Sequence, residues 1–312
     1  MKIGIDVFGG DYAPEAVIMG SILAAKNLTS DSKLVLIGDT EKIDYFCKRE
    51  NFDSSVFEIV HTTEFIQMGD YPARAYSQKP DSSIVKGFRL LAGGKIDAFI
   101  SAGNTGAMMV GATQVIKAIP GVIRPCIAAK VSRLNQKPML LLDVGINPDC
   151  RPDVLYQYAI LGSIYVKNVF NVQDPRVGLL NIGSEEEKGN LLTKAAFQTM
   201  KDSKDFNFIG NLEGNDLFSD KADVMVSDGF VGNVIIKEAE AFYEMIKKRK
   251  IKDDFFENFN FENHGGTPIL GINAPVLIGH GISNDIAIKN MILHAADVIK
   301  GNICEQFKEA FK

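Results

Sequence analysis

The sequence predicts an α/β protein in which helices cover both faces of a mostly parallel, mixed sheet. Short apolar runs typical of buried strands alternate with longer segments of helical periodicity. Most of these runs end in a turn rich in glycine with asparagine, serine or aspartate, and a helix is expected after the turn. One pair of runs, at 125–131 and 139–144, is joined only by the polar segment 133–137 and predicts an antiparallel hairpin.

The first third of the chain follows a strand–helix–strand order. The expected elements are strands at 2–7, 34–39 and 56–60, and helices at 15–27 and 42–49. Pro14 lies where the first turn of a helix tolerates proline. The stretch 61–80 has no clear period and contains Pro72 and Pro80, so it predicts a long loop of the kind that is often functional.

The remaining elements continue the same alternation. Strands are expected at 97–100, 177–180, 206–209, 224–226 and 276–278, and helices at 82–91, 107–117, 154–166 and 191–201. A turn is expected at Gly265-Gly266, and the segment 265–271 leads to the strand at 276–278. The helix after Asn233 carries an apolar stripe formed by Ile235, Ile236, Ala239, Phe242, Tyr243 and Ile246.

Composition excludes several classes of protein. The 312 residues are 46% hydrophobic, which is enough for a sizeable core, yet no apolar run reaches the roughly 18 residues of a membrane span. The start of the chain lacks a signal-peptide core, so we expect a cytoplasmic protein. A net charge of −5 argues against general nucleic-acid binding. The four cysteines are far apart, so we expect reduced thiols, with Cys126 and Cys150 as small core residues.

The glycine-rich turns predict an anion site. They follow the strands that end at Val7, Ile100, Val144, Leu180, Val226 and Ile278. Ligands of open α/β sheets bind at the carboxyl ends of the strands, and the N–H groups at helix starts favour anions. Glycine and asparagine are also simply good turn residues, so the prediction of one phosphate crevice rests on the repetition.

Individual residues allow two interpretations. Asn104 or Thr105 is expected to cap the helix that begins there. Lys188 directly precedes another helix, where a cation suits phosphate, but it equally suits a solvated lysine balanced by three preceding glutamates. His280, between two glycines, has the position of a general acid or oxyanion donor, although a lone histidine is more often structural.

Motifs of other catalytic classes are missing from the sequence. There is no GxxxxGK[ST], no GxGxxG after the first strand and no GxSxG. None of the four histidines shows a metal-ligand spacing. We therefore expect no nucleotide cofactor and no covalent nucleophile.

Taken together and in order, several motifs resemble the PlsX family of phosphate acyltransferases from the first residue to about Asn290. They are Gly9-Gly10-Asp11-x-Ala13-Pro14, Ser101-Ala102-Gly103-Asn104-Thr105-Gly106-Ala107, Arg124-Pro125, Leu142-Asp143-Val144-Gly145-x-Asn147, Leu180-Asn181-Ile182-Gly183-x-Glu185-x-x-Lys188-Gly189, Asp228-Gly229-Phe230-x-Gly232-Asn233-Val234 and Gly279-His280-Gly281.

The resemblance implies a dimeric three-layer α/β/α sandwich, similar to phosphotransacetylases and isopropylmalate dehydrogenases. It implies transfer of a fatty acyl group from acyl carrier protein to orthophosphate, with phosphate as the nucleophile and no metal or other cofactor. The acyl phosphate would serve a membrane glycerol-3-phosphate acyltransferase, and a peripheral membrane contact would accompany this role. The expected organisation is a single domain, 1–312, with a shortened helical projection at about 238–263.

The resemblance also suggests site residues. The catalytic candidates are Lys188, Asn233 and His280. The substrate-binding candidates are Gly10, Asp11, Arg74, Lys79, Ser101, Gly103, Asn104, Thr105, Gly106, Asp143, Asn147, Gly183 and Gly232. The basic run Lys247, Lys248, Arg249 and Lys250 is a candidate docking site for the acidic carrier protein, or else a helix end that complements its own dipole.

Three departures from the family pattern stand out. The loop that resembles Arg-Ala-x-Arg-x-Lys begins at Arg74 and ends at Lys79, but Ser77 replaces its second arginine. The segment from Phe242 to His264 is shorter than its counterpart in the family, and Pro148 replaces a common valine. Two other functions stay open: a short-chain phosphotransacetylase acting on acyl-CoA, and a non-catalytic scaffold for lipid-synthesis partners.

Overall fold

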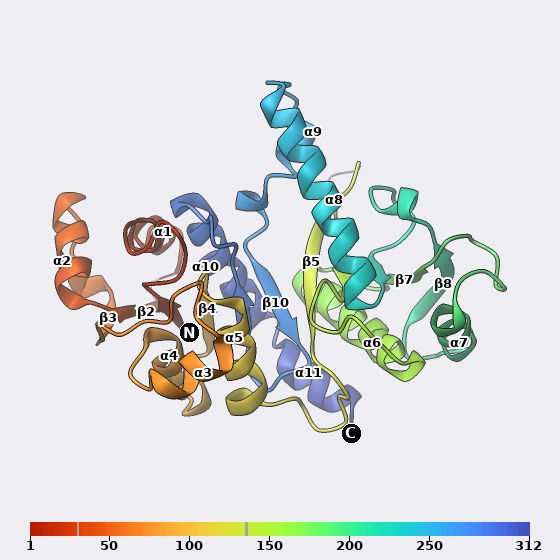
Figure 1. Ribbon diagram of the computed structural model, residues 1–312, viewed down its shortest axis with the longest axis horizontal. Helices are drawn as coiled ribbons and strands as arrows, with labels where there is room; N and C mark the ends of the chain where they lie inside the picture. Colours follow the sequence, from red (N-terminus) through yellow and green to blue (C-terminus); the bar gives the residue numbers. More distant parts are fainter. Residues whose placement is uncertain (30, 135–136) are drawn as a thin grey trace. The chain divides into compact units, whose positions relative to one another are not determined.

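The computed structural model describes residues 1–29, 31–134 and 137–312 (Figure 1). The chain falls into two compact units. Unit 1 comprises Met1–Lys117 and Phe261–Lys300, and unit 2 comprises Ala118–Asn260 and Gly301–Lys312. The expectation of a single domain stays a prediction.

The described strands of unit 1 form a mostly parallel sheet. Their order is β3 (Glu58–His61), β2 (Lys33–Gly38), β1 (Lys2–Asp6), β4 (Ala98–Ser101), β11 (Val276–Ile278) and β10 (Thr267–Leu270). The pairs from β3 to β11 are parallel, and β10 is antiparallel to β11. Apart from the edge strand β3, which is partly exposed, these strands are buried along nearly their whole length because helices cover both faces.

Helices lie on both sides of this sheet (Figure 1). One side carries α1 (Glu15–Ala25) and α10 (Asp285–Lys300), and the other carries α3 (Pro72–Gln78), α4 (Ser83–Ala92) and α5 (Thr105–Gly111). Close packing needs small residues at the contacts: a Cβ on Gly87 would lie 2.2 Å from the Phe99 ring. α2 (Thr40–Arg49) completes the βαβ unit between β2 and β3.

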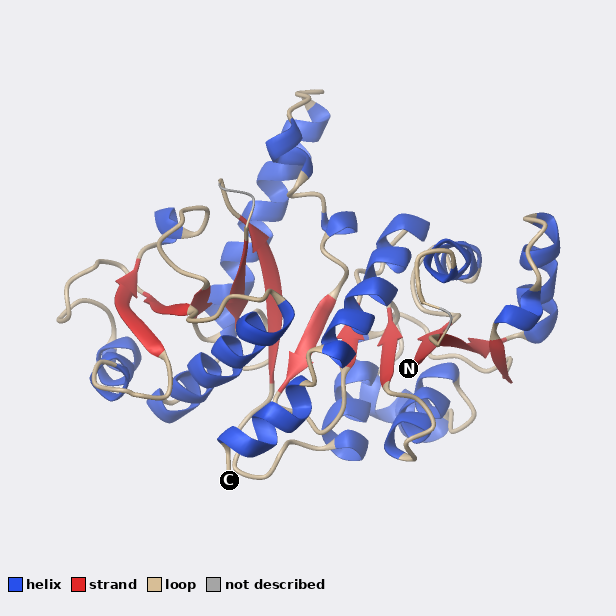
Figure 2. Ribbon diagram, turned by 180° about the vertical axis from the view of Figure 1, so that it is seen from behind, coloured by secondary structure: helices blue, strands red, loops and turns tan. Residues whose placement is uncertain are grey.

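Unit 2 has the same kind of sheet (Figure 2). The order of its described strands is β5 (Cys126–Ser132), β6 (Pro138–Leu142), β9 (Val224–Val226), β7 (Arg176–Leu180) and β8 (Asn207–Leu212). All pairs are parallel except β5–β6, which forms the predicted hairpin. The helices are α6 (Pro152–Val169), α7 (Leu191–Met200), α8 (Gly229–Lys248), α9 (Asp254–Glu257) and α11 (Ile303–Ala310). The predicted fold class is therefore confirmed.

Several local predictions were wrong. The expected loop 61–80 contains α3, which begins at Pro72 because proline suits the first helical turn. Strand β10, which follows the turn expected at Gly265-Gly266, was not predicted because glycines flank it on both sides. The helix expected over 107–117 is α5 followed by a π-helical turn, Ala112–Ile116.

In the polar turn expected at 133–137, Arg133 is buried rather than exposed. Arg133 is only 1% exposed and donates to the carbonyl oxygen of Ala222 at 2.5 Å and to Asp223 at 3.2 Å. Residues 135 and 136 of this turn lie outside the described residues. None of the described helices is both long enough and apolar enough to cross a membrane.

Candidate active site

Three glycine-rich turns of unit 1 meet at one edge of its sheet. β1, β4 and β11 are parallel neighbours, so their carboxyl ends lie at the same edge, which we call the first edge. The amide of Asp11 donates to the carbonyl of Gly281 at 2.7 Å. A Cβ on Gly9 would lie 2.8 Å from the Gly103 nitrogen, so these turns approach more closely than larger residues allow. The turns after β1, β4 and β11 therefore lie together within unit 1. The prediction that all six glycine-rich turns surround one phosphate stays a prediction.

A buried carboxylate holds the first edge together. Asp6 is 2% exposed, accepts from the Ser101 hydroxyl at 2.6 Å and accepts from the Phe8 amide at 3.1 Å. The Ser101 oxygen accepts in turn from the Gly103 amide at 2.9 Å. Burial raises the pKa of Asp6, although hydrogen bonds from Ser101, Ser83 and Phe8 oppose this shift. Asp6 was not among the predicted site residues, although its position at the end of the first strand could have indicated it.

Asn104 caps α5 and ties the preceding loop to it. Its side-chain oxygen accepts from the Ala107 amide at 2.9 Å, which settles the choice between Asn104 and Thr105. Its amide nitrogen donates to the carbonyls of Gln67, Met68 and Asp70, at 3.0, 3.2 and 3.0 Å. With these partners the Asn104 side chain positions the loop, while Thr105 and Gly106 occupy the first turn of α5.

The two predicted cations of this loop differ in their surroundings. The Lys79 ammonium pairs with Asp70 at 2.6 Å and donates to the Phe65 carbonyl at 3.1 Å, so it fixes the loop. The exposed Arg74 donates to Gln78 at 3.2 Å and forms no ion pair with any described residue. Ser77, in place of the second arginine, donates to the Arg74 carbonyl at 2.9 Å.

His280 begins the turn after β11. It is half-buried, and its carbonyl accepts from the amide and the hydroxyl of Ser283, at 3.0 and 2.6 Å. Gly10 lies beside this turn with a φ of +105°, a conformation that favours glycine, and a Cβ there would lie 3.0 Å from the Gly281 carbonyl oxygen. Gly10, Asp11 and the His280 turn therefore form one packed group.

Unit 2 has a corresponding edge, which we call the second edge. β6, β9 and β7 are parallel neighbours, and Val226 is in register with Leu142 on one side and Leu179 on the other. The residues that follow these strand ends therefore lie side by side, at the strand spacing of about 5 Å. They include Asp143, Ser227 and Asn181.

Asp143 anchors the turn after β6. It is fully buried and accepts from the amides of Ile127 at 3.0 Å and Asn147 at 2.7 Å, and from the Asn147 side chain at 3.1 Å. The Asn147 carbonyl accepts from the Gly229 amide at 2.8 Å, where α8 begins. Asp143 and Asn147 therefore fix the turn after β6 to the start of α8.

The first turn of α8 packs directly on the end of β6. Asp228 caps the helix by accepting from the Val231 amide at 2.8 Å. A Cβ on Gly232 would lie 1.9 Å from the Asp143 carbonyl oxygen, so only glycine fits there. The exposed Asn233 donates to the Val144 carbonyl at 3.1 Å and lies over Gly145, whose φ is +143°. Asn233 retains a second amide hydrogen that this bond does not use.

The loop after β7 presents Lys188 at the second edge. Asn181 donates to the carbonyl of Lys188 at 3.2 Å and to Asn211 at 3.1 Å, so the loop is tied to β8. A Cβ on Gly183 would lie 2.9 Å from the Lys188 side chain. Lys188 is exposed, and its ammonium forms no ion pair with any described residue. Glu186 pairs with Lys201 at 2.9 Å instead, so it does not balance Lys188. Three further side chains hold these turns in place, although none was a predicted site residue: Asn181, Asn211 and Asp228.

The thiols near the second edge are not activated. Burial, together with the carboxylates of Asp143 and Asp228, raises the pKa of the Cys150 thiol to about 11 despite a lowering hydrogen bond from Tyr158. Burial also raises the pKa of Cys126 well above its usual range. At neutral pH these groups are thiols, and a thiol is a poor nucleophile compared with a thiolate.

Comparison with known proteins identifies the class. A family model described as "Fatty acid synthesis protein" matches residues 1–306, so the chain belongs to this family. Membership makes it a transferase of lipid biosynthesis.

Curated relatives carry a more particular name, phosphate acyltransferase. That of Dictyoglomus turgidum is 40% identical over 329 aligned positions, and that of Endomicrobium trichonymphae 41% over 334; each alignment covers 99% of this chain and 97% of the relative. Both alignments exceed the 312 residues of this chain, so the relatives carry residues that it lacks.

Solved structures support the fold. The EutD phosphotransacetylase from Staphylococcus aureus is similar with a TM-score of 0.66 at 18% identity, covering 96% of this chain and 94% of that protein. At this identity the similarity bears on the fold alone.

Proposed function

We propose that the protein transfers a fatty acyl group from acyl carrier protein to orthophosphate and so produces an acyl phosphate. Support comes from the family, whose curated members are named phosphate acyltransferase, and from the cation and amide at the second edge. We further propose that it works in the cytoplasm as a homodimer, in peripheral contact with the membrane. There the acyl phosphate would be consumed by a membrane glycerol-3-phosphate acyltransferase.

The reaction needs no nucleophile from the protein. An oxygen of bound phosphate attacks the thioester carbonyl carbon and forms a tetrahedral oxyanion. The oxyanion collapses with cleavage of the carbon–sulfur bond, which leaves acyl phosphate and a thiolate that takes up a proton. The protein must hold phosphate and thioester together and stabilise the oxyanion. The raised pKa values of Cys150 and Cys126 agree with a direct attack.

One observation carries this proposal: the Lys188 ammonium, unpaired among the described residues, lies at the same sheet edge as Asn233. Lys188 would bind the phosphate dianion, and the unused amide hydrogen of Asn233 would donate to the oxyanion. His280 would protonate the leaving sulfur. The remaining contacts are assigned to Gly10, Asp11, Arg74, Ser101, Gly103, Thr105, Gly106 and Gly183, whereas Lys79, Asn104, Asp143, Asn147 and Gly232 would position them.

Separate Lys188→Ala and Asn233→Ala variants test these roles. Lys188→Ala should raise the KM for phosphate about 10- to 100-fold, because a charge-assisted contact is lost. Asn233→Ala should lower kcat about 100-fold, as expected for one oxyanion donor. Lys194→Ala is the matched control, since Lys194 is an exposed lysine of α7 without an ion pair among the described residues. Near-normal acyl phosphate formation by both variants would remove these residues from the mechanism.

The same assay separates the alternatives. A short-chain phosphotransacetylase would prefer acetyl-CoA to long-chain acyl carrier protein. A non-catalytic scaffold would show no loss of acyl thioester that depends on orthophosphate.

A further inference from the structure

The loop that carries Lys188 is largely exposed. It spans residues 182–190, between β7 and α7, and every residue from Ser184 to Lys188 is exposed. The Glu186 carboxylate contacts α7, but exposed contacts of this kind hold a backbone weakly. The position of the Lys188 ammonium therefore depends on the buried groups that bind the main chain of the loop.

Two asparagine side chains, each only 8% exposed, bind that main chain. Asn211 of β8 donates to the Glu185 carbonyl at 2.9 Å. Asn181 donates to the Lys188 carbonyl at 3.2 Å and to the side-chain oxygen of Asn211 at 3.1 Å. The Glu185 carbonyl also accepts from the Lys188 amide at 3.1 Å, so the turn that ends at Lys188 closes on the same oxygen that Asn211 holds. Asn211 therefore connects this turn to the sheet.

A β-bulge aims Asn211 inward. Val177 of β7 is in register with Phe208, but Leu179 is in register with Asn211, so β8 contains one extra residue between these pairs. Residues three apart in a regular strand point to opposite faces, and the extra residue reverses this relation for Asn211. Gly210 has a φ of +95°, which favours glycine, although a Cβ there would meet nothing within 4 Å. The backbone of β8 thus departs from regular geometry at the point where it turns Asn211 toward the loop.

We propose that Asn211 is a positioning residue of the phosphate site, which fixes the 182–190 loop so that the Lys188 ammonium stays at the second edge. This inference rests on the proposed function, in which Lys188 binds orthophosphate. Asn211 touches no reacting atom and acts through the main chain of the loop. Without it, phosphate binding would have to order the loop first, and this ordering lowers affinity.

Removing the Asn211 side chain tests this role. Asn211→Ala should raise the KM for orthophosphate about five- to tenfold, because the loop loses a buried hydrogen bond, and should change the KM for acyl carrier protein less than about twofold. Asn207→Ala is the matched control, since Asn207 is an exposed residue of the same strand that donates to Asp174 at 2.7 Å. It should leave both KM values unchanged.

A second variant keeps the test decisive if Asn211→Ala does not fold. Gly210→Ala strains the bulge without a steric clash, so it should also raise the KM for orthophosphate. In both variants the amides of residues 182–190 should exchange their hydrogens faster than in the wild type, and in Asn207→Ala they should not. Unchanged exchange in this loop would contradict the anchoring by Asn211.

A double-mutant cycle shows whether Asn211 acts through Lys188. Calorimetric titration with orthophosphate gives the Kd without turnover. In the Lys188→Ala background, Asn211→Ala should weaken phosphate binding no further, because no ammonium is left to position. An equal loss in both backgrounds would overturn this inference. So would unchanged phosphate binding in folded Asn211→Ala and Gly210→Ala when Lys188→Ala weakens it, and the proposed function would then stand. The expected Kd values without phosphate-dependent turnover of the wild type would overturn the proposed function alone.

Discussion

The buried carboxylate of Asp6 shows how a single residue fixes the first edge. It receives hydrogen bonds from Ser101 and Phe8, and Ser101 in turn orients the Gly103 amide. Burial nevertheless disfavours the charged form and raises the pKa of Asp6. The carboxylate therefore organises the turns at a cost in stability that depends on pH.

Replacing Asp6 with asparagine should remove this pH dependence. The folded protein keeps the Asp6 proton at pH values where the unfolded chain, with a pKa of about 3.9, has lost it. The free energy of unfolding of the wild type should therefore fall, relative to Asp6→Asn, as pH rises from about 4 through the raised pKa of the folded state. Denaturant titrations of both proteins across this range measure the difference. A difference that stays flat, or that grows in favour of the wild type, would contradict the assigned burial cost.

Residue-scale predictions from sequence succeeded where the chemistry is local. The capping role at residues 104–105 follows from neighbouring residues alone. The partners of the Asn104 amide lie 34 to 37 residues away. The buried Arg133 donates to Ala222 and Asp223, which lie 89 and 90 residues away, as well as to nearby carbonyls. Such contacts appear only when the chain folds. For this reason the sequence did not show what Asn104 and Arg133 contact, and the substrate-binding role of Asn104 stays a prediction.

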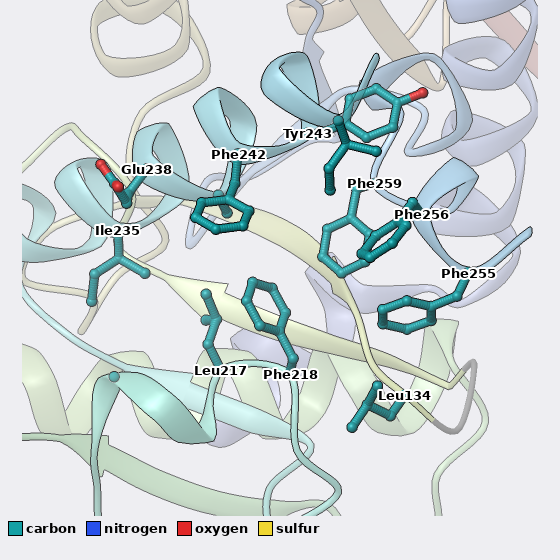
Figure 3. Close-up of a pocket in the computed structure, with 13 residues that line it drawn as sticks. Leu134, Leu217, Phe218, Ile235, Glu238, Phe242, Tyr243, Phe255, Phe256 and Phe259 are labelled. Carbon is teal, nitrogen blue, oxygen red and sulfur yellow. The ribbon is translucent and has the colours of Figure 1, made fainter. Parts of the chain in front are cut away.

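At the scale of elements, α8 combines several roles in one helix. Its N-terminal part carries Gly232 and Asn233, its middle lines an apolar cavity within unit 2 (Figure 3), and its last turn carries Lys247 and Lys248. Arg249 and Lys250 follow directly and are exposed. The stripe predicted from periodicity does face one side, but the structure places a cavity against it. Periodicity identifies an apolar face without showing what covers it.

Reversing the charges at the end of α8 tests carrier-protein docking. The variant Lys247→Glu/Lys248→Glu/Arg249→Glu should raise the KM for acyl carrier protein about tenfold at low salt, because steering of the acidic partner is lost, and less at high salt. A control with Lys167, Lys194 and Lys204 changed to glutamate alters the net charge equally at other exposed positions of unit 2. An unchanged KM at low salt, or an equal rise in the control, would leave the basic run as a helix end that complements its own dipole.

At the scale of the whole molecule, the sequence predicted the alternation of strands and helices and the fold class. Each unit gathers glycine-rich turns at the carboxyl ends of parallel strands, after β1, β4 and β11 in one and after β6, β9 and β7 in the other. Strand β10 was missed because glycines flank it on both sides. That the turns of both units bind one phosphate stays a prediction, as do the dimer and the membrane contact.

The central claim is that bound orthophosphate itself attacks the thioester. A single-turnover reaction of wild-type protein with long-chain acyl carrier protein and isotopically labelled orthophosphate tests it most directly. We expect the label in acyl phosphate, in an amount equal to the acyl group lost, and no acyl group attached to the protein at any time after rapid quenching. An acylated protein formed before phosphate is added, or thioester loss without labelled acyl phosphate, would contradict the account.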